Sequence, residues 1–290
     1  MALSENIEIL VISIRIKIIF VGDKTNSMKK VSFLLFALLF MASCKAPVAP
    51  EFHDNPVISH RGAWKETGHP QNSLASFKAA AELGCHGSEC DVWITADDSL
   101  VIFHDPKRDG MRLETSTYAD ITDKPLANGE KIPTLREYIA VSRQYPQTKL
   151  IIDVKTHEDP ERTRAVFCAV DKVVKALNYE AKIEYLIGYL PLYKEFAAMT
   201  DRPIAYLGRW MEELPEMHPD TIAAYGIKHL DYQDVHYHAH PEWIESFKAD
   251  RVHLNAWTIN TEESMDFFLA NDFNYITTDY PTLLLQKCSK

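Results

Sequence analysis

Short apolar runs alternate with longer amphipathic segments from residue 56 to the end of the chain. The short runs are rich in valine, isoleucine and leucine, as buried strands are. The longer segments space their apolar residues along one helical face, as Leu74, Phe77 and Ala81 show. The expected strands are 56–62, 86–95, 149–156, 183–189, 203–209, 227–233, 251–259 and 274–278. The expected helices are 72–84, 159–178, 191–200, 211–224, 241–249, 261–271 and one that begins at Thr134.

Strand–helix alternation repeated eight times predicts an α/β protein with the (β/α)8 TIM barrel fold. An open doubly wound sheet would give the same alternation, but no glycine-rich phosphate-binding loop follows the first strand. Residues 106–133 break the rhythm, because they are rich in charge, proline and glycine and are longer than an ordinary loop of about 2–6 residues. We expect them to form a small insertion after the second strand, over the mouth of the barrel.

The start of the chain has the order of a lipoprotein signal peptide. A basic stretch at 28–30 precedes the uncharged apolar run 31–41, and small residues then lead into Cys44. This order predicts cleavage before Cys44 and a lipid on that cysteine. An ordinary N-terminal helix is the alternative. A membrane-spanning helix is not expected, because it would need about 20 apolar residues and this run is shorter. The expected organisation is 1–43 as upstream extension and signal peptide, 44–55 as linker and 56–290 as barrel. Met28 is the expected start of translation. The exported chain is expected to be anchored by its lipid in the bacterial cell envelope, in the periplasm or at the cell surface.

The overall charge is acidic, with 41 aspartates and glutamates against 31 lysines and arginines and a formal net charge of −10. A nucleic-acid-binding surface needs clustered lysine and arginine, so the sequence predicts no nucleic-acid partner. Export would permit disulfides among Cys85, Cys90, Cys168 and Cys288. Their wide spacing does not match a disulfide framework, and we expect buried thiols instead.

Carboxylates cluster on two neighbouring strands of the predicted barrel. Glu89 and Asp91 are two residues apart in the second strand, so their side chains share a face. Asp153 lies on the third strand, on the face opposite Ile152 and Val154. Oxygen ligands without thiolates suit a hard divalent cation, which predicts a Mg²⁺ or Ca²⁺ site.

Histidines and basic residues occur at the same strand ends, where barrels of this fold carry their active sites. His60 and Arg61 end the first strand, and Lys155 shares the face of Asp153. His104 ends a continuation of the second strand at 100–104, which follows a turn at Asp97 and Asp98. Arg61 and Lys155 would contact a phosphate, and two histidines on different strands would act as general base and acid. With a metal polarising a phosphoryl oxygen, this set predicts cleavage of a small phosphodiester without a covalent protein intermediate.

These residues lie in sequence blocks that resemble the glycerophosphodiester phosphodiesterase family. The first and most specific block is HRGAWKETGHPQNSLASFKAAAELGCHGSECDVWITADDSLVIFHD, residues 60–105. Further blocks in the family's order are IPTLREYI (132–139), LIIDVK (150–155), LNAWTIN (254–260) and ITTDYP (276–281). The resemblance implies a barrel with an insertion after the second strand. It also implies metal-dependent hydrolysis of glycerophosphodiesters to glycerol phosphate and an alcohol, used to scavenge phospholipid head-group fragments at the envelope.

The resemblance also implies a role for each matched residue. It gives His60 and His104 as the acid/base pair, Arg61 and Lys155 as phosphate contacts, Glu89 and Asp91 as metal ligands, and Trp257 as an aromatic near the alcohol portion of the substrate. Two positions depart from the family, which usually has glutamate where this chain has Gln71 and Asp153. Gln71 loses a charge, so we expect altered loop anchoring or substrate choice. Asp153 is one methylene shorter, so we expect a shifted metal geometry or an added water.

Two other functions fit the same residues. One keeps the chemistry but changes the substrate to a lysophospholipid, a phosphoinositide-like lipid or a teichoic-type polymer. The polar character of 106–133 favours soluble diesters instead. The other is a non-catalytic surface-binding module on a degenerate barrel, against which the retained His60, His104 and Lys155 argue. The histidines at 236, 238 and 240 are expected in a solvated loop, and a transition-metal site there is the less favoured alternative.

Overall fold

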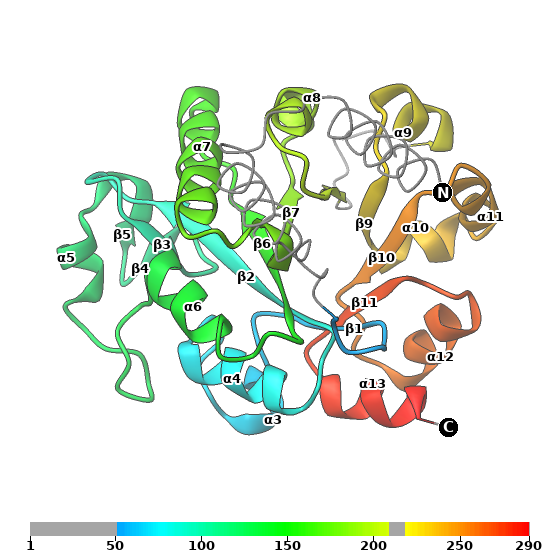
Figure 1. Ribbon diagram of the computed structural model, residues 1–290, viewed down its shortest axis with the longest axis horizontal. Coiled ribbons are helices and arrows are strands. Elements are labelled where there is room, and N and C mark those ends of the chain that lie inside the picture. The colour runs from blue at the N-terminus through cyan, green and yellow to red at the C-terminus, as the bar shows by residue number, and fades with distance from the viewer. Residues whose placement is uncertain (1–50, 209–217, 290) are drawn as a thin grey trace, which may run out of the picture. The chain divides into compact units, whose positions relative to one another are not determined.

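The computed structural model describes residues 51–208 and 218–289 (Figure 1). The predicted signal peptide and Cys44 lie outside the described residues, as does part of the helix expected at 211–224. No helix within the two described ranges is long and apolar enough to cross a membrane.

Eight parallel strands close into a barrel, as the alternation predicted. The first strand, β1 (Val57–Ser59), pairs with β2 (Gly87–Ile94) on one side and with β11 (Tyr275–Thr278) on the other, which closes the ring. Between β2 and β11 the strands follow in chain order: β6 (Lys149–Val154), β7 (Ile183–Ile187), β8 (Ile204–Gly208), β9 (His229–Gln233) and β10 (His253–Trp257). The open doubly wound sheet is therefore excluded.

Helices surround the strands and bury their outward faces (Figure 1). Several begin at capping residues that the sequence provides. Thr134 and Glu137 form a capping box at the start of α6, and the Asp159 side chain caps α7 ahead of a proline. The helices within residues 51–208 and 218–289 are α3 (Trp64–Thr67), α4 (Leu74–Glu82), α5 (Tyr118–Thr122), α6 (Leu135–Ser142), α7 (Pro160–Ala176), α8 (Leu190–Met199), α9 (Pro219–Tyr225), α10 (Asp234–Ala239), α11 (Glu242–Ala249), α12 (Glu262–Ala270) and α13 (Pro281–Cys288), with 3-10 turns at Leu113–Thr115 and Glu180–Lys182.

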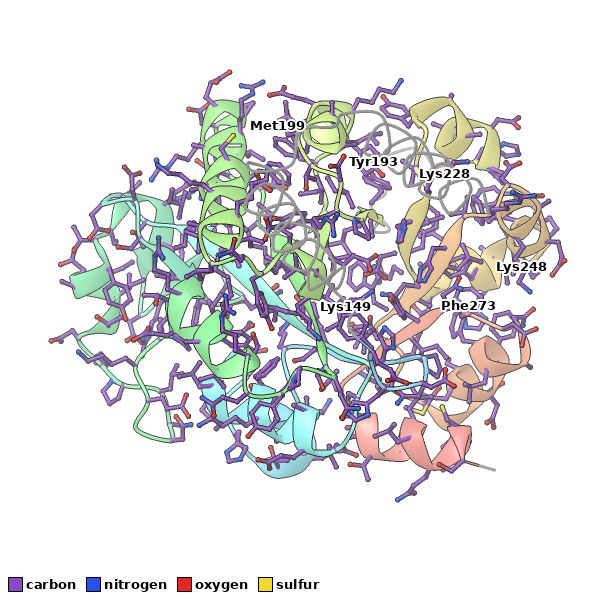
Figure 2. The ribbon with its side chains drawn as sticks, in the orientation of Figure 1. Lys149, Tyr193, Met199, Lys228, Lys248 and Phe273 are labelled. Atoms are coloured by element: carbon purple, nitrogen blue, oxygen red, sulfur yellow. The ribbon has the colours of Figure 1, made fainter. Side chains whose placement is uncertain are left out.

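The main core lies between the strands and this helical layer. Aromatic rings fill much of it, for example Phe167 of α7, which stacks on Phe196 of α8 with ring centroids 4.2 Å apart. Tyr193 of α8 donates its hydroxyl to the carbonyl of Ile204 in β8, and Phe273 packs edge-on against Tyr237. Figure 2 labels Tyr193 and Phe273 among the side chains of the structure. Such packing fixes the strands, and with them the side chains that point into the barrel.

The interior of the barrel is filled at the end where the strands begin. There Glu184 accepts hydrogen bonds from Lys149 Nζ (3.3 Å) and His229 Nδ1 (2.9 Å), and Lys149 also donates to the Tyr275 hydroxyl at 2.6 Å. Above this network, Ile151 and neighbouring apolar side chains form a small inner cluster. The space that remains inside the barrel therefore lies toward the carboxyl ends of the strands.

The segment expected to extend the second strand folds back instead. β3 (Leu100–Ile102) is antiparallel to β2, with Trp93 opposite Val101. The insertion continues from it as the hairpin β4 (Lys107–Arg108) and β5 (Met111–Arg112), the first 3-10 turn and α5. A separate small core of Trp93, Val101, Leu113, Ile121 and Ile132 holds the insertion against β2 and β3.

Two lesser expectations differ from the structure. The prediction of a solvated loop for the histidines 236–240 is wrong, because residues 234–239 form α10 and His236 is buried against Tyr232. Tyr237 anchors that helix by donating its hydroxyl to the Asn255 carbonyl at 3.0 Å. Among the cysteines of the described chain none forms a disulfide. Cys85 and Cys90 are buried as expected, Cys168 is partly exposed, and Cys288 is exposed, contrary to expectation.

Candidate active site

Every residue that the sequence singled out for the site lines one cavity of about 150 Å³ at the carboxyl ends of the strands. These residues are His60, Arg61, Glu89, Asp91, His104, Asp153, Lys155 and Trp257; Leu186, Leu207, Asp231 and Thr277 complete the lining. None of the residues 106–133 is part of it. The insertion therefore supports the wall of the site through β3 but does not form its surface.

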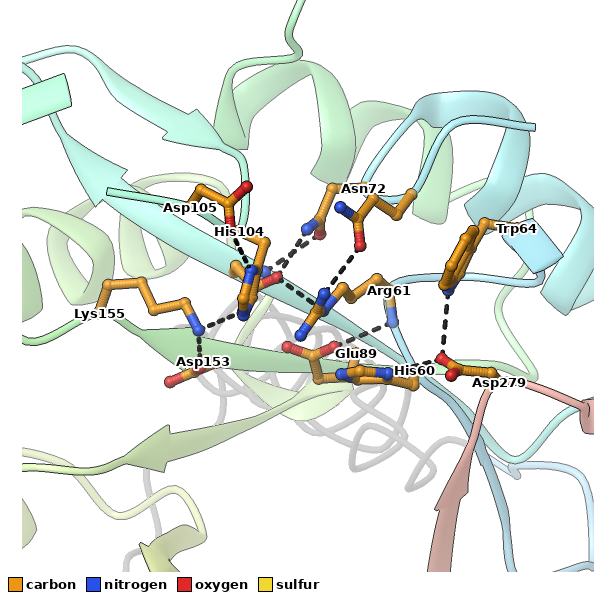
Figure 3. Close-up of polar contacts among 12 residues, drawn as sticks. His60, Arg61, Trp64, Asn72, Glu89, His104, Asp105, Asp153, Lys155 and Asp279 are labelled. Atoms are coloured by element: carbon orange, nitrogen blue, oxygen red, sulfur yellow. Dashed lines mark hydrogen bonds and ion pairs between the residues drawn. The ribbon is translucent and has the colours of Figure 1, made fainter. Parts of the chain in front are cut away.

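The turn after β1 places Arg61 beside the carboxylates. Arg61 and Gly62 both have positive φ, at 56° and 79°, and a Cβ on Gly62 would lie 2.5 Å from the Ser76 backbone. Glycine is thus required for α4 to approach the turn. The Arg61 amide donates to Glu89 Oε2 at 2.9 Å, and its guanidinium donates to Gln71 Oε1 at 2.8 Å (Figure 3). Gln71, one of the two departures from the family, therefore anchors the Arg61 side chain.

His60 is held by an aspartate that the sequence analysis did not assign to the site. The ring Nδ1 of His60 lies 2.7 Å from Asp279 Oδ1. Asp279 also accepts hydrogen bonds from Trp64 Nε1 (3.3 Å) and Asn260 Nδ2 (2.9 Å). Burial alone would raise the pKa of Asp279, but the contact with His60, the hydrogen bond from Asn260 and the charge of Lys65 lower it to about 2. Burial lowers the pKa of His60. The signal for Asp279 was available, since it follows directly after β11 within the ITTDYP block.

His104 reaches the cavity because β3 reverses direction. The Phe103 amide donates to the Asp91 carbonyl at 3.0 Å, which sets His104 alongside the middle of β2. Trp93 Nε1 donates to the His104 carbonyl at 3.2 Å, and the His104 ring contacts Asp105 through Nδ1 at 2.7 Å. Its side chain is 33 % exposed, against 15 % for His60. The two imidazoles therefore come from different segments, His60 after β1 and His104 after β3, with His104 nearer to solvent.

The three predicted metal ligands converge as expected from strand alternation. Asp91 and Asp153 are partners in the β2–β6 register, and one oxygen from each of Glu89, Asp91 and Asp153 lies within 4.8 Å of the others. All three side chains are buried. Burial, followed by the charges of Asp91 and Asp153, raises the pKa of Glu89 well above its usual range. The cluster is therefore short of positive charge.

Lys155 supplies part of that charge. Its Nζ lies 2.5 Å from Asp91 Oδ1 and 2.6 Å from Asp153 Oδ2 (Figure 3). Burial would raise the pKa of Asp91, but Lys155 and Arg61 together hold it well below its usual range. Three carboxylates still face only two cationic side chains, so the fully ionised cluster carries a net negative charge that would repel a phosphodiester anion. A divalent cation would reverse that sign, and the oxygen donors fit Mg²⁺ or Ca²⁺.

Two further side chains of the site were missed in the sequence. Asn72, which precedes α4 with φ of 60°, donates from Nδ2 to Asp91 Oδ2 at 2.6 Å and accepts from the Asp91 amide at 3.2 Å. This pair fixes the carboxylate's orientation. Asp231 enters the cavity from β9 and is 1 % exposed. Nothing local in the sequence marked Asp231, because its strand was assigned only from its apolar neighbours.

The chain is similar in sequence and in structure to known proteins. The sequence model of the Glycerophosphoryl diester phosphodiesterase family matches residues 60–283. Glycerophosphodiester phosphodiesterase 1 of Bos taurus is 36 % identical over 279 residues, which cover 80 % of this chain and 79 % of that protein. The glycerophosphodiester phosphodiesterase of Caldanaerobacter subterraneus is 26 % identical over 251 residues, covering 81 % and 98 %. A crystal structure of a glycerophosphodiester phosphodiesterase from Parabacteroides distasonis superposes with a TM-score of 0.75 at 32 % identity, covering 82 % of this chain and 98 % of that one.

Proposed function

Because the chain belongs to the glycerophosphoryl diester phosphodiesterase family, we propose that it hydrolyses glycerophosphodiesters to glycerol phosphate and an alcohol, with a bound divalent cation and histidine acid/base catalysis. The observation that carries this proposal is the joint placement of two imidazoles, two cationic side chains and three carboxylates around one cavity. A binding module would not need two imidazoles beside a phosphate site.

His60 is the general base in this mechanism. Asp279 is ionised at neutral pH because its pKa is about 2, so His60 Nδ1 carries the proton that bonds Asp279 Oδ1. Nε2 is then left with a free lone pair. Burial lowers the pKa of His60 and keeps the ring neutral. The neutral ring accepts a proton from the attacking water at Nε2.

His104 is the general acid, which protonates the oxygen of the departing alcohol. Its position nearer to solvent suits this role, because the alcohol must leave through the open side of the cavity. Arg61 contacts the phosphoryl oxygens with its guanidinium, and Lys155 does so from its place between Asp91 and Asp153. Trp257 packs against the organic portion of the substrate.

Glu89, Asp91 and Asp153 hold the divalent cation. When bound, the cation supplies a Lewis acid that polarises a phosphoryl oxygen. Asn72 keeps the Asp91 carboxylate oriented toward the cluster. Asp153, one methylene shorter than the glutamate usual in the family, leaves room in the shell for water, which both Mg²⁺ and Ca²⁺ accept.

A substrate panel tests the activity. We expect the purified protein to release sn-glycerol 3-phosphate from glycerophosphocholine and glycerophosphoethanolamine, and to act more slowly on a lysophospholipid, because the cavity lining is mainly polar and charged. Faster turnover of the lysophospholipid would favour the lipid substrate. Absence of turnover with every diester, in the presence of either Mg²⁺ or Ca²⁺, would contradict the proposal.

Export and lipid anchoring on Cys44 form part of the proposal, supported by the order of the basic, apolar and small residues at 28–44. We expect Cys44→Ala to move the protein from the detergent-requiring membrane fraction to the soluble fraction, because the lipid is lost. Cys288→Ala, which changes an exposed cysteine of the barrel, is the matched control and should stay in the membrane fraction. A wild-type protein that is soluble and begins at Met1 would refute the anchor.

A further inference from the structure

Asp231 is a buried acid of the cavity that the mechanism above leaves without a role. In β9, Leu230 and Tyr232 pack into the outer core, so Asp231 points into the barrel by strand alternation. It lines the same cavity as the metal-ligand cluster. Its Oδ1 is buried and has no hydrogen-bond partner in the described part of the chain. A buried oxygen without a partner costs stability, so its retention calls for an explanation.

The position of Asp231 defines which end of a substrate it would meet. In the ring of eight strands, β9 is four strands from β2 in either direction, so Asp231 faces the carboxylates of β2 from across the barrel. Its neighbour on that wall is Trp257 of β10, whose Nε1 donates to the Asp231 carbonyl at 3.1 Å. A phosphate held at the β2–β6 wall would extend its organic portion toward Asp231 and Trp257.

The departing alcohol and the glycerol portion of the substrate would lie at different depths in the cavity. Asp231 is 1 % exposed, whereas the His104 side chain, which serves the departing alcohol, is 33 % exposed. The alcohol that leaves therefore occupies the open side. The portion that stays on the phosphate, the glycerol, occupies the deep side beside Asp231.

We propose that Asp231 is a specificity residue, whose free Oδ1 hydrogen-bonds a hydroxyl of the glycerol portion and so selects polyol phosphodiesters. This inference rests on the proposed phosphodiesterase function and deepens it. The chemistry matches, because burial, with the charges of Glu184 and Asp153, raises the pKa of Asp231 well above its usual range. The unpartnered Oδ1 can accept a hydrogen bond from a hydroxyl, and the raised pKa disfavours the ionised form that a cationic head group would need.

The test removes the carboxyl group of Asp231 from the protein and, separately, each free glycerol hydroxyl from the substrate. Wild type, Asp231→Asn and Asp231→Leu are compared on glycerophosphocholine and on its two analogues that each lack one free glycerol hydroxyl. Leucine removes the hydrogen bond, and asparagine keeps a donor and an acceptor. We expect Asp231→Leu to lower kcat/KM for glycerophosphocholine by about 10- to 100-fold. For at least one of the two analogues, the kcat/KM of wild type should already be lower by a similar factor. Asp231→Leu should lower the kcat/KM for that analogue little further. Asp231→Asn should keep most of the wild-type preference.

Further measurements separate hydroxyl recognition from a structural role and from recognition of the head group. Asp171→Asn, which changes a buried carboxylate of α7 outside the cavity, is the control and should leave the preference between substrates unchanged. Equal loss on all substrates in Asp231→Leu would assign Asp231 a structural role, or a buried water as its partner, and overturn the proposal. A loss that disappears when choline is replaced by ethanol would show ammonium recognition and would also overturn it. If Asp231→Leu does not fold, Asp231→Ala serves the same comparison. Failure of wild type to cleave any diester would instead refute the phosphodiesterase function.

Discussion

His60→Ala and His104→Ala are each expected to lower kcat by roughly 10²–10⁴-fold, because each removes one of the two proposed proton-transfer groups. The two rings line the same cavity from different segments and have different roles in the proposal, so neither is expected to replace the other. Steady-state turnover of glycerophosphocholine measures the loss. Thermal unfolding of the same variants should show Tm within a few degrees of wild type, because neither imidazole belongs to the packed core.

Controls separate catalysis from folding. His238→Ala changes an exposed histidine of α10 that does not line the cavity, and its turnover should match wild type. Asp279→Asn should reduce turnover by weakening the hold on His60, and should have no further effect once His60 is alanine. Either histidine variant retaining near-wild-type turnover would show that its assignment is wrong.

The dependence of kcat/KM on pH is a second test of His60 as the general base. The pKa of His60 is lowered by burial, so the base remains neutral and active from neutral pH down to somewhat below the ordinary histidine range. The acid limb of kcat/KM should fall as the pH drops through that lowered pKa. The contact with Asp279 raises the His60 pKa, so Asp279→Asn should move the acid limb to lower pH. An acid limb that moves to higher pH would contradict this role of Asp279.

Removal of divalent cations is expected to abolish activity and to lower Tm. Without a cation, Glu89, Asp91 and Asp153 share a small buried volume and their mutual repulsion destabilises the mouth of the barrel. A bound cation stabilises the fold by mass action, by about 2.7 kcal/mol at a hundredfold excess over its Kd. Activity and thermal unfolding after EDTA treatment and dialysis, followed by return of Mg²⁺ or Ca²⁺, measure both effects.

Variants of Asp153 test which residues hold the ion. Asp153→Asn should weaken metal affinity strongly, because it removes a charged ligand and one of the two carboxylates that pair with Lys155. Asp153→Glu restores the residue usual in the family and should remain active. Glu184→Gln provides a matched control, since this buried carboxylate lies outside the cavity and should leave the metal dependence unchanged. Full activity after exhaustive removal of divalent ions, or unchanged metal dependence in Asp153→Asn, would refute the site.

The sequence by itself predicted the barrel and most of the residues that line the candidate cavity, for a local physical reason. Residues two apart on a strand share a face, so Glu89 with Asp91, and Asp153 with Lys155, could be placed together without knowing the fold in detail. The carboxyl ends of parallel strands meet at one end of a barrel, so these pairs and His60 were expected in one place. The structure puts them around one cavity.

Only the tertiary structure decided the contacts that join distant segments. The turn at 97–98, where Asp98 has φ of 59°, reverses the chain, and that reversal rather than a strand extension brings His104 to the cavity. Asp279 lies 219 residues from the His60 ring that it orients. Asp231 has no local motif, and its unpartnered oxygen becomes visible only when eight strands close around it. Alternation along a strand predicts on which face of the strand a side chain lies. Which side chains from other strands meet it there depends on the order of the strands and on the closure of the barrel. That order is set by contacts between segments that are distant in the sequence.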